Sequence, residues 1–333
     1  MSKPRDASRK SFSEFQLIAR LSAGLRLSRR TILGAGDDCA IVSQRGRALL
    51  TIDSLVENTH FDLRWGTPRQ LGWRALAVNL SDIAAMGGRP TACVVNLAVR
   101  DGISARMLDQ IYAGLRDAAR ESSTDIVGGN IARARELSIT IALLGEVGHG
   151  VMRRDTARPS DEIFVTGTFG DAALGWRILS GKLKPRGSAR KDRAAREYVV
   201  ERFLHPSARL YAGQRLASMR PAPAAIDVSD GLMQDLGHIL ERSGVGAEID
   251  ASRVPVSSAY RALMGDNLEH ALTGGEDYEL IFCTRAGRGD AEQSRRLGVR
   301  VTRIGTIVRG KGLKMTGYRA PAVAGWDQLR SRG

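Results

Sequence analysis

The feature that most constrains the fold is an alternation of short apolar runs with amphipathic segments, separated by glycine, proline and aspartate. Residues 48–52 read as a strand, 67–86 as a helix and 91–99 as a second, buried strand. Ser104 is a typical N-cap residue and predicts a further helix that reaches about residue 121. Strands that alternate with helices in this way indicate an α/β protein.

The alternation continues to the end of the chain, and 333 residues are enough for about two domains. We predict strands at 125–127 and 137–147, with Gly128, Gly129 and Asn130 as the turn between them. This closes a first unit. We therefore divide the chain into an N-terminal domain, 1–149, and a C-terminal domain, 150–333, each with mixed sheets flanked by helices.

The net charge of +14 is concentrated in three windows. Residues 1–30, 182–196 and 285–311 hold 23 Lys and Arg against five acids, so the rest of the chain is slightly acidic. The stretch 181–196 reads as a mobile insertion. Binding of nucleic acid through these windows stays an alternative, and it would be sensitive to salt. No zinc-finger or aromatic RNA-binding motif accompanies the charge, so we expect no specific nucleic acid partner.

The chain has the composition of an ordinary globular protein, with 43% hydrophobic and 26% charged residues. No apolar run approaches the 18 or more residues that a membrane-spanning helix needs, so we expect no membrane partner and a cytoplasmic location. Cys39, Cys93 and Cys283 are odd in number and widely spaced, which favours neither a disulfide framework nor a zinc site.

Carboxylates gather at the predicted ends of strands and helices, next to small residues. They are Asp37, Asp38, Asp53, Asp82, Asp227, Asp230, Glu276 and Asp277. A single aspartate at such a place is usually a cap or a turn residue. Several of them converging would repel one another and require cations. Oxygen ligands without paired His or Cys favour magnesium, which in turn favours phosphate oxygens, so the pattern indicates a nucleotide phosphate site.

Two common phosphate-binding motifs are absent from the sequence. It has no P-loop (GxxxxGK followed by Ser or Thr) and no protein-kinase set. The Gly167–Gly170 turn before a predicted helix is at best a weak anion site. Any phosphate chemistry must therefore use a different scaffold.

Six motifs in this order make the chain resemble the thiamine-monophosphate kinase family, of the superfamily that includes aminoimidazole ribonucleotide synthetase. They are GDD at 36–38, TID at 51–53, HF at 60–61, AVNLSD at 77–82, DVSDG at 227–231 and GGEDYEL at 274–280. The resemblance spans nearly the whole chain. It implies the two-domain fold of that superfamily, a homodimer formed through the N-terminal halves, and ATP-dependent phosphorylation of thiamine monophosphate by direct in-line transfer with several magnesium ions.

The resemblance also implies roles for individual residues, none of which is a general base. The implied metal-binding residues are Asp38, Thr51, Asp53, Asp82, Asn130, Asp227 and Asp230. The implied ATP-binding residues are Tyr112, Gly129, Asn130, Arg154 and Ser229. On the acceptor side they are His60, Glu276 and Trp326, where an aromatic ring stacks on thiamine and Glu276 faces its positive charge.

The chain departs from the family pattern at two positions. Asn130 stands where an aspartate is expected, and Ile52 where a second hydroxyl often follows Thr51. An asparagine oxygen can still bind magnesium, although one ligand charge is lost. Two alternatives stay open at this stage: another ATP-dependent enzyme of the same superfamily that activates a different small molecule, and a non-catalytic basic binding protein that has kept the fold.

Overall fold

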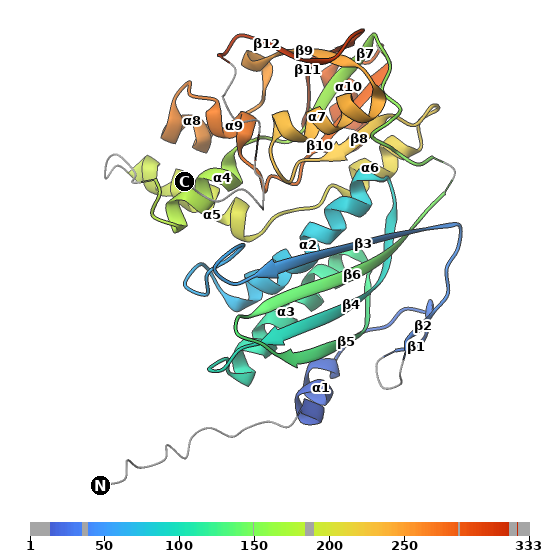
Figure 1. Cartoon of the computed structure of the whole chain (residues 1–333), viewed down its shortest axis with the longest axis vertical. Coiled ribbons are helices and arrows are strands. Elements are labelled where there is room, and N and C mark those ends of the chain that lie inside the picture. Colours follow the sequence, from blue (N-terminus) through green and yellow to red (C-terminus); the bar gives the residue numbers. More distant parts are fainter. Residues whose placement is uncertain are drawn as a thin grey trace.

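The computed structural model describes residues 14–34, 39–148, 150–183, 190–285 and 287–319, together with Gly325. Two β-sheets dominate it, one above the other in Figure 1. The first sheet runs in the order β3 (Arg47–Val56), β6 (Ser138–Val147), β4 (Arg89–Val99), β5 (Asp125–Arg133). The second runs β12 (Gly312–Thr316), β9 (Gly246–Asp250), β11 (Val301–Val308), β7 (Asp161–Thr166), β10 (Leu280–Arg285), β8 (Ala224–Asp227).

Both sheets mix parallel and antiparallel neighbours. In the first sheet β6 pairs antiparallel with β3 and β4, whereas β4 and β5 are parallel and are joined through a helix. In the second sheet only β9 and β12 are parallel. The predicted fold class, an α/β protein with mixed sheets flanked by helices, is confirmed.

Two helices, α2 (Pro68–Ala85) and α3 (Ala105–Ser122), cover one face of the first sheet. Thr67 and Gln70 form a complete capping box, and Pro68 occupies the first turn, where a missing N–H costs nothing. The helices cross closely at two glycines. A Cβ on Gly72 would lie 1.8 Å from the Ile111 carbonyl oxygen, and one on Gly114 equally close to that of Arg69. This crossing fixes α2 against α3.

The opposite face of the first sheet carries exposed apolar side chains. Leu50 is 75% exposed, Ile52 65% and Val94 42%. Thr51 and Asp53 alternate with them along β3 and therefore point to the side of the sheet that α2 covers. Leu49 and Leu55 share this inner face and pack in the core, so Thr51 and Asp53 are polar positions between apolar ones.

The second sheet packs its own helices and core. The helices after the first domain are α4 (Asp171–Leu179), α5 (Arg190–Leu204), α6 (Leu210–Ala217), α7 (Leu232–Ser243), the short 3-10 helix Ala251–Arg253, α8 (Ser258–Met264), α9 (Glu269–Thr273) and α10 (Asp290–Leu297). A separate apolar cluster joins the two halves: Ala85 of α2 packs with Ala212 and Leu216 of α6 and with Phe164 of β7. The two halves of the chain are therefore joined by a packed apolar contact.

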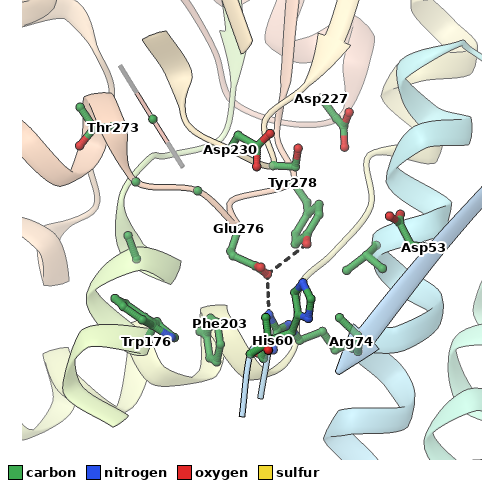
Figure 2. A pocket seen from close by; sticks show the side chains of 18 of the residues that line it. Asp53, His60, Arg74, Trp176, Phe203, Asp227, Asp230, Thr273, Glu276 and Tyr278 are labelled. Atoms are coloured by element: carbon green, nitrogen blue, oxygen red, sulfur yellow. Dashed lines mark hydrogen bonds and ion pairs between the residues drawn. The ribbon is translucent and has the colours of Figure 1, made fainter. Parts of the chain in front are cut away.

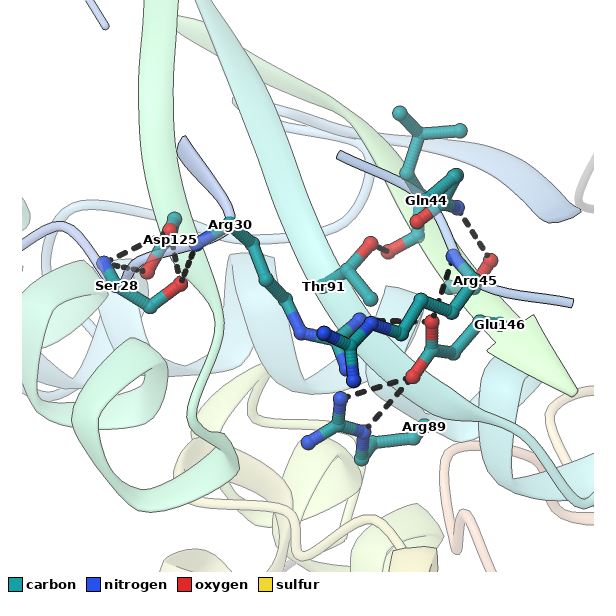
Figure 3. Close-up of polar contacts among 10 residues, drawn as sticks. Ser28, Arg30, Gln44, Arg45, Arg89, Thr91, Asp125 and Glu146 are labelled. Carbon is teal, nitrogen blue, oxygen red and sulfur yellow. Dashed lines mark hydrogen bonds and ion pairs between the residues drawn. The ribbon is translucent and has the colours of Figure 1, made fainter. Parts of the chain in front are cut away.

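The chain before β3 forms α1 (Glu14–Ser22) and a small pair of strands, β1 (Thr31–Leu33) and β2 (Ile41–Val42). Two carboxylates of the first sheet hold this segment in place (Figure 3). Asp125 accepts from the backbone N–H of Ser28 at 3.0 Å, and Glu146 pairs with Arg30 at 2.7 Å and with Arg89 at 2.8 Å.

Most predicted elements are present, with three corrections. The strand expected at 48–52 runs on to Val56, so Asp53 lies within β3 and not after its end. The glycines at 128 and 129 do not form a turn: β5 runs through them to Arg133, because they pair in parallel with Val94 and Val95 of β4. A Cβ on Gly129 would lie 2.0 Å from the Val95 carbonyl oxygen, so the close approach requires glycine. The predicted mobile insertion is helical from Arg190 onward, and residues 184–189 lie outside the described part. No helix among the described residues is long and apolar enough to cross a membrane.

Candidate active site

A cavity of about 790 Å³ opens in the cleft between the two sheets. Both halves of the chain line it: β3 and α2 from the first, and α4, α5 and the loops around residues 227–231 and 270–278 from the second. Figure 2 shows the carboxylates of Asp53, Asp227 and Asp230 on one side of the opening, and Trp176 and Phe203 on another. The cavity therefore has an acidic region and an aromatic one.

Four of the predicted metal-binding residues line this one cavity: Asp53, Asp82, Asp227 and Asp230. They come from the inner face of β3, the last turn of α2, the end of β8 and the loop after it. Thr51 donates its hydroxyl hydrogen bond to Asp82, and Ser81 donates to Asp227 at 2.7 Å. The Thr51 hydroxyl thus orients Asp82, and the Ser81 hydroxyl orients Asp227.

The protein environment opposes ionisation of Asp53, Asp82 and Asp227. Burial raises the pKa of Asp53 to about 7, and the charges of Asp82, Asp227, Glu276 and Asp230 add to the effect. Burial also raises the pKa of Asp82 and of Asp227, and repulsion from Asp82 adds to the shift at Asp227. The Arg154 guanidinium acts in the opposite direction on both. A bound cation that neutralises these acids therefore lowers the free energy of the folded chain.

The donor set suits magnesium. In the described part of the chain, no three Asp, Glu, His or Cys side chains come close enough to hold a metal ion by themselves. Magnesium is usually bound by only one or two carboxylates, with waters and substrate phosphates completing its shell. Oxygen-only donors of raised pKa, spaced around an open cavity, fit a cation that arrives with a phosphate.

Glu276 and His60, predicted on the acceptor side, also line the cavity. Glu276 has a φ of 72° and Tyr278 a φ of 52°, a left-handed backbone that is uncommon for such residues and that often occurs at functional sites. The Tyr278 hydroxyl donates to Glu276 Oε2 at 3.0 Å, and His60 Nδ1 accepts from the backbone N–H of Val56 at 3.1 Å.

The predicted ATP-binding residues are more scattered. Ser229 lines the cavity, whereas Tyr112, Gly129, Asn130 and Arg154 do not. Tyr112 is buried in the core of the first sheet, and Asn130 is exposed on β5 and donates to Asn96 Oδ1 at 2.8 Å. Arg154 is exposed, yet its charge reaches Asp82 and Asp227. Asp38 and Trp326 lie outside the described residues.

Four residues of the site were not among those predicted from the sequence. Arg74 is buried on α2 and pairs with Glu276, and Trp176 and Phe203 supply aromatic walls to the cavity. Asp235 accepts from the backbone N–H groups of Ser229, Asp230 and Gly231 at 3.0–3.1 Å and so fixes the acidic loop. Asp235 lies in the first turn of α7, where an acid near exposed N–H groups was a usable signal. The other three sit inside helices without any local mark.

Comparison with known proteins agrees with this architecture. Residues 36–147 match the model of the AIR synthase related protein N-terminal domain, and residues 158–317 match that of the C-terminal domain. The thiamine-monophosphate kinase of Escherichia coli O157:H7 is 39% identical over 302 residues, which cover 88% of this chain and 90% of that protein.

Solved structures give the same result. The crystal structure of thiamine-monophosphate kinase from Stenotrophomonas maltophilia K279a is 36% identical with a TM-score of 0.78, covering 92% of this chain and 96% of that one. A structure of AaThiL complexed with AMPPCP and TMP is 32% identical with a TM-score of 0.72, over 84% and 86% of the two chains. By its two domains and its relatives over most of its length, this chain belongs to the thiamine-monophosphate kinase family of AIR synthase related proteins.

Proposed function

We propose that this chain transfers the γ-phosphoryl group of ATP to the phosphate of thiamine monophosphate, giving thiamine diphosphate by direct in-line displacement. The observation that carries the proposal is a single cavity that brings Asp53, Asp82, Asp227 and Asp230 opposite Glu276 and His60. A relative of the same fold has been solved with both AMPPCP, an ATP analogue, and TMP. Cavity chemistry and family thus support the same reaction.

In this mechanism the chain acts by positioning and by charge. In-line phosphoryl transfer needs two phosphates held in line and their negative charge neutralised, so no general base is required. Asp53, Asp82, Asp227 and Asp230, with Thr51 as the hydroxyl partner of Asp82, would hold magnesium. When bound, magnesium supplies charge neutralisation and orients the phosphate oxygens. Asp38 and Asn130 complete the proposed metal-binding set.

Ser229 is the proposed ATP contact within the cavity, and Asp235 holds its backbone in place. Tyr112, Gly129, Asn130 and Arg154 complete the proposed ATP-binding set, and Arg154 supplies a fixed positive charge. On the acceptor side we propose His60, Glu276 and Trp326. Trp176, which is half-buried, lines the same cavity and offers further aromatic surface for the thiamine rings.

We also propose that the chain works as a cytoplasmic homodimer, with 1–149 as the ATP, magnesium and dimerisation domain and 150–333 completing the acceptor site. Leu50, Ile52 and Val94 form an exposed apolar patch on the outer face of the first sheet, which a second copy would cover. Asn130 is exposed on β5 of the same sheet. Use of ATP favours the cytoplasm.

The test is product analysis of purified protein with ATP, magnesium and thiamine monophosphate. We expect thiamine diphosphate, formed only with metal and only from the monophosphate, with free thiamine as the control acceptor. Binding of magnesium-ATP without diphosphate formation would refute the acceptor and favour another activity of the superfamily. Failure to bind ATP, together with salt-sensitive binding of RNA, would instead favour a non-catalytic basic protein.

A further inference from the structure

Arg74 is a buried cation at the centre of the cleft. Its side chain is 2% exposed, on the helix α2 that covers the first sheet, and it lines the cavity. An unpaired charge at this depth would be costly, so an arginine here needs specific partners. Its partners come from three separate parts of the chain.

The Arg74 guanidinium joins both halves of the chain (Figure 2). Nη2 pairs with Glu276 Oε2 at 2.7 Å, and Nη1 donates to the backbone carbonyl oxygen of His60 at 2.9 Å. The guanidinium carbon lies 4.1 Å from the centre of the Phe203 ring. One side chain therefore sets the positions of the His60 backbone, the Glu276 carboxylate and the aromatic wall of α5 relative to one another.

These contacts place the two oxygens of the Glu276 carboxylate in different environments. Oε2 accepts from both Arg74 and the Tyr278 hydroxyl, at 2.7 and 3.0 Å. Oε1 has no hydrogen-bond partner among the described residues, and Glu276 lines the cavity with about 29% of its side chain exposed. The carboxylate is thus neutralised on one oxygen and open on the other.

We propose that Arg74 is a positioning residue for the acceptor: it fixes Glu276 and His60 across the cleft and leaves Oε1 of Glu276 to accept a hydrogen bond from an N–H group of the acceptor. The inference rests on the proposed function, in which that acceptor is thiamine monophosphate, whose aminopyrimidine ring carries such a group. Because Arg74 already compensates the charge of Glu276, the site selects a hydrogen-bond donor rather than a net positive charge.

The geometry requires arginine rather than lysine. The two terminal nitrogens of one planar fork reach the His60 carbonyl and Glu276 while the flat face packs on Phe203. A lysine retains the positive charge and much of the buried stem but presents a single ammonium. It therefore cannot keep both hydrogen bonds and the stacking contact in the same arrangement.

The test compares Arg74→Lys with wild type by steady-state kinetics and by calorimetric binding of thiamine monophosphate. We expect KM and Kd for the acceptor to rise about tenfold to hundredfold, the range for loss of one hydrogen bond to a charged group, with KM for ATP changed less than about twofold. Arg69→Lys is the matched control, because Arg69 lies on the same helix and pairs with Asp117 away from the cavity. It should change neither constant.

Two outcomes of this comparison would overturn the proposal. One is an unchanged acceptor Kd in Arg74→Lys. The other is an equal rise for ATP and acceptor, which would indicate a general structural role. A double variant sharpens the comparison: in a Glu276→Ala background, Arg74→Lys should weaken acceptor binding much less than it does in wild type, and an undiminished effect would also overturn it.

The design separates this proposal from the proposed function. If wild type binds thiamine monophosphate without turning it over, the proposed function fails, and the calorimetric comparison still tests Arg74. If Arg74→Lys does not fold, Glu276→Gln takes its place. Arg74 and Tyr278, which donate to Oε2, would hold the amide oxygen of the glutamine and turn its amide nitrogen, which cannot accept a hydrogen bond, toward the acceptor. An acceptor Kd within about twofold of wild type in that variant would then refute the proposal.

Discussion

Replacing Asp53 by asparagine should stabilise the protein in the absence of magnesium while abolishing most turnover. Burial and the charges of Asp82, Asp227, Glu276 and Asp230 raise the pKa of Asp53 from 3.8 to about 7. At about 1.4 kcal/mol for each pH unit, the ionised carboxylate costs the folded state up to about 4 kcal/mol. Asparagine removes the repulsion but remains buried, so we expect a gain of about 1–3 kcal/mol at pH 8.

The sign of the pH dependence follows from proton linkage. Between pH 3.8 and about 7 the folded chain binds a proton at Asp53 more tightly than the unfolded chain does, so wild-type stability falls as the pH rises through this interval. The asparagine side chain of the variant does not titrate. The advantage of Asp53→Asn should therefore be larger at pH 8 than at pH 5, and magnesium should reduce it, because the metal stabilises only the carboxylate form.

The assay is denaturant unfolding in EDTA at both pH values, repeated with magnesium. Asp101→Asn is the matched control: Asp101 pairs with Arg133 and its side chain is 79% exposed, so the effect of the substitution should stay within about 0.5 kcal/mol. Suppose that Asp53→Asn is no more stable than wild type at pH 8 in EDTA. Then the inference that burial and neighbouring acids destabilise ionised Asp53, which supports the metal site, is wrong.

Two further predictions concern the reaction and the assembly. Asp230→Asn should lower turnover by at least about a hundredfold with the circular dichroism spectrum unchanged, because it removes charge from the phosphate region rather than volume from the core; near-normal turnover at saturating magnesium would contradict the assigned role. Ile52→Glu, at a position 65% exposed, should convert a dimer to a monomer by light scattering, whereas Tyr211→Glu, 62% exposed on α6, should not; an unchanged dimer would place the interface elsewhere.

Local signals predicted the regular elements well. Ser104 was predicted as an N-cap and caps α3, and apolar runs mark β4 and β6. The glycines at 128 and 129 were misleading because the same residue type serves both a turn and a tight backbone approach. Only the position of β4, whose Val95 carbonyl lies against Gly129, decides between the two.

For the candidate site, the sequence by itself determined the chemistry. Asp82 and Asp227 lie at the ends of α2 and β8, where turn signals place them, and Asp53 lies within β3 on the alternating face that α2 covers, so the topology brings these acids together. Only the tertiary structure decided how their charges are balanced. Arg74 looks like any helical arginine until α2 packs across the cleft from Glu276, 202 residues further along the chain. Burial, pairing and pKa depend on neighbours that are distant in sequence, and no local pattern encodes them.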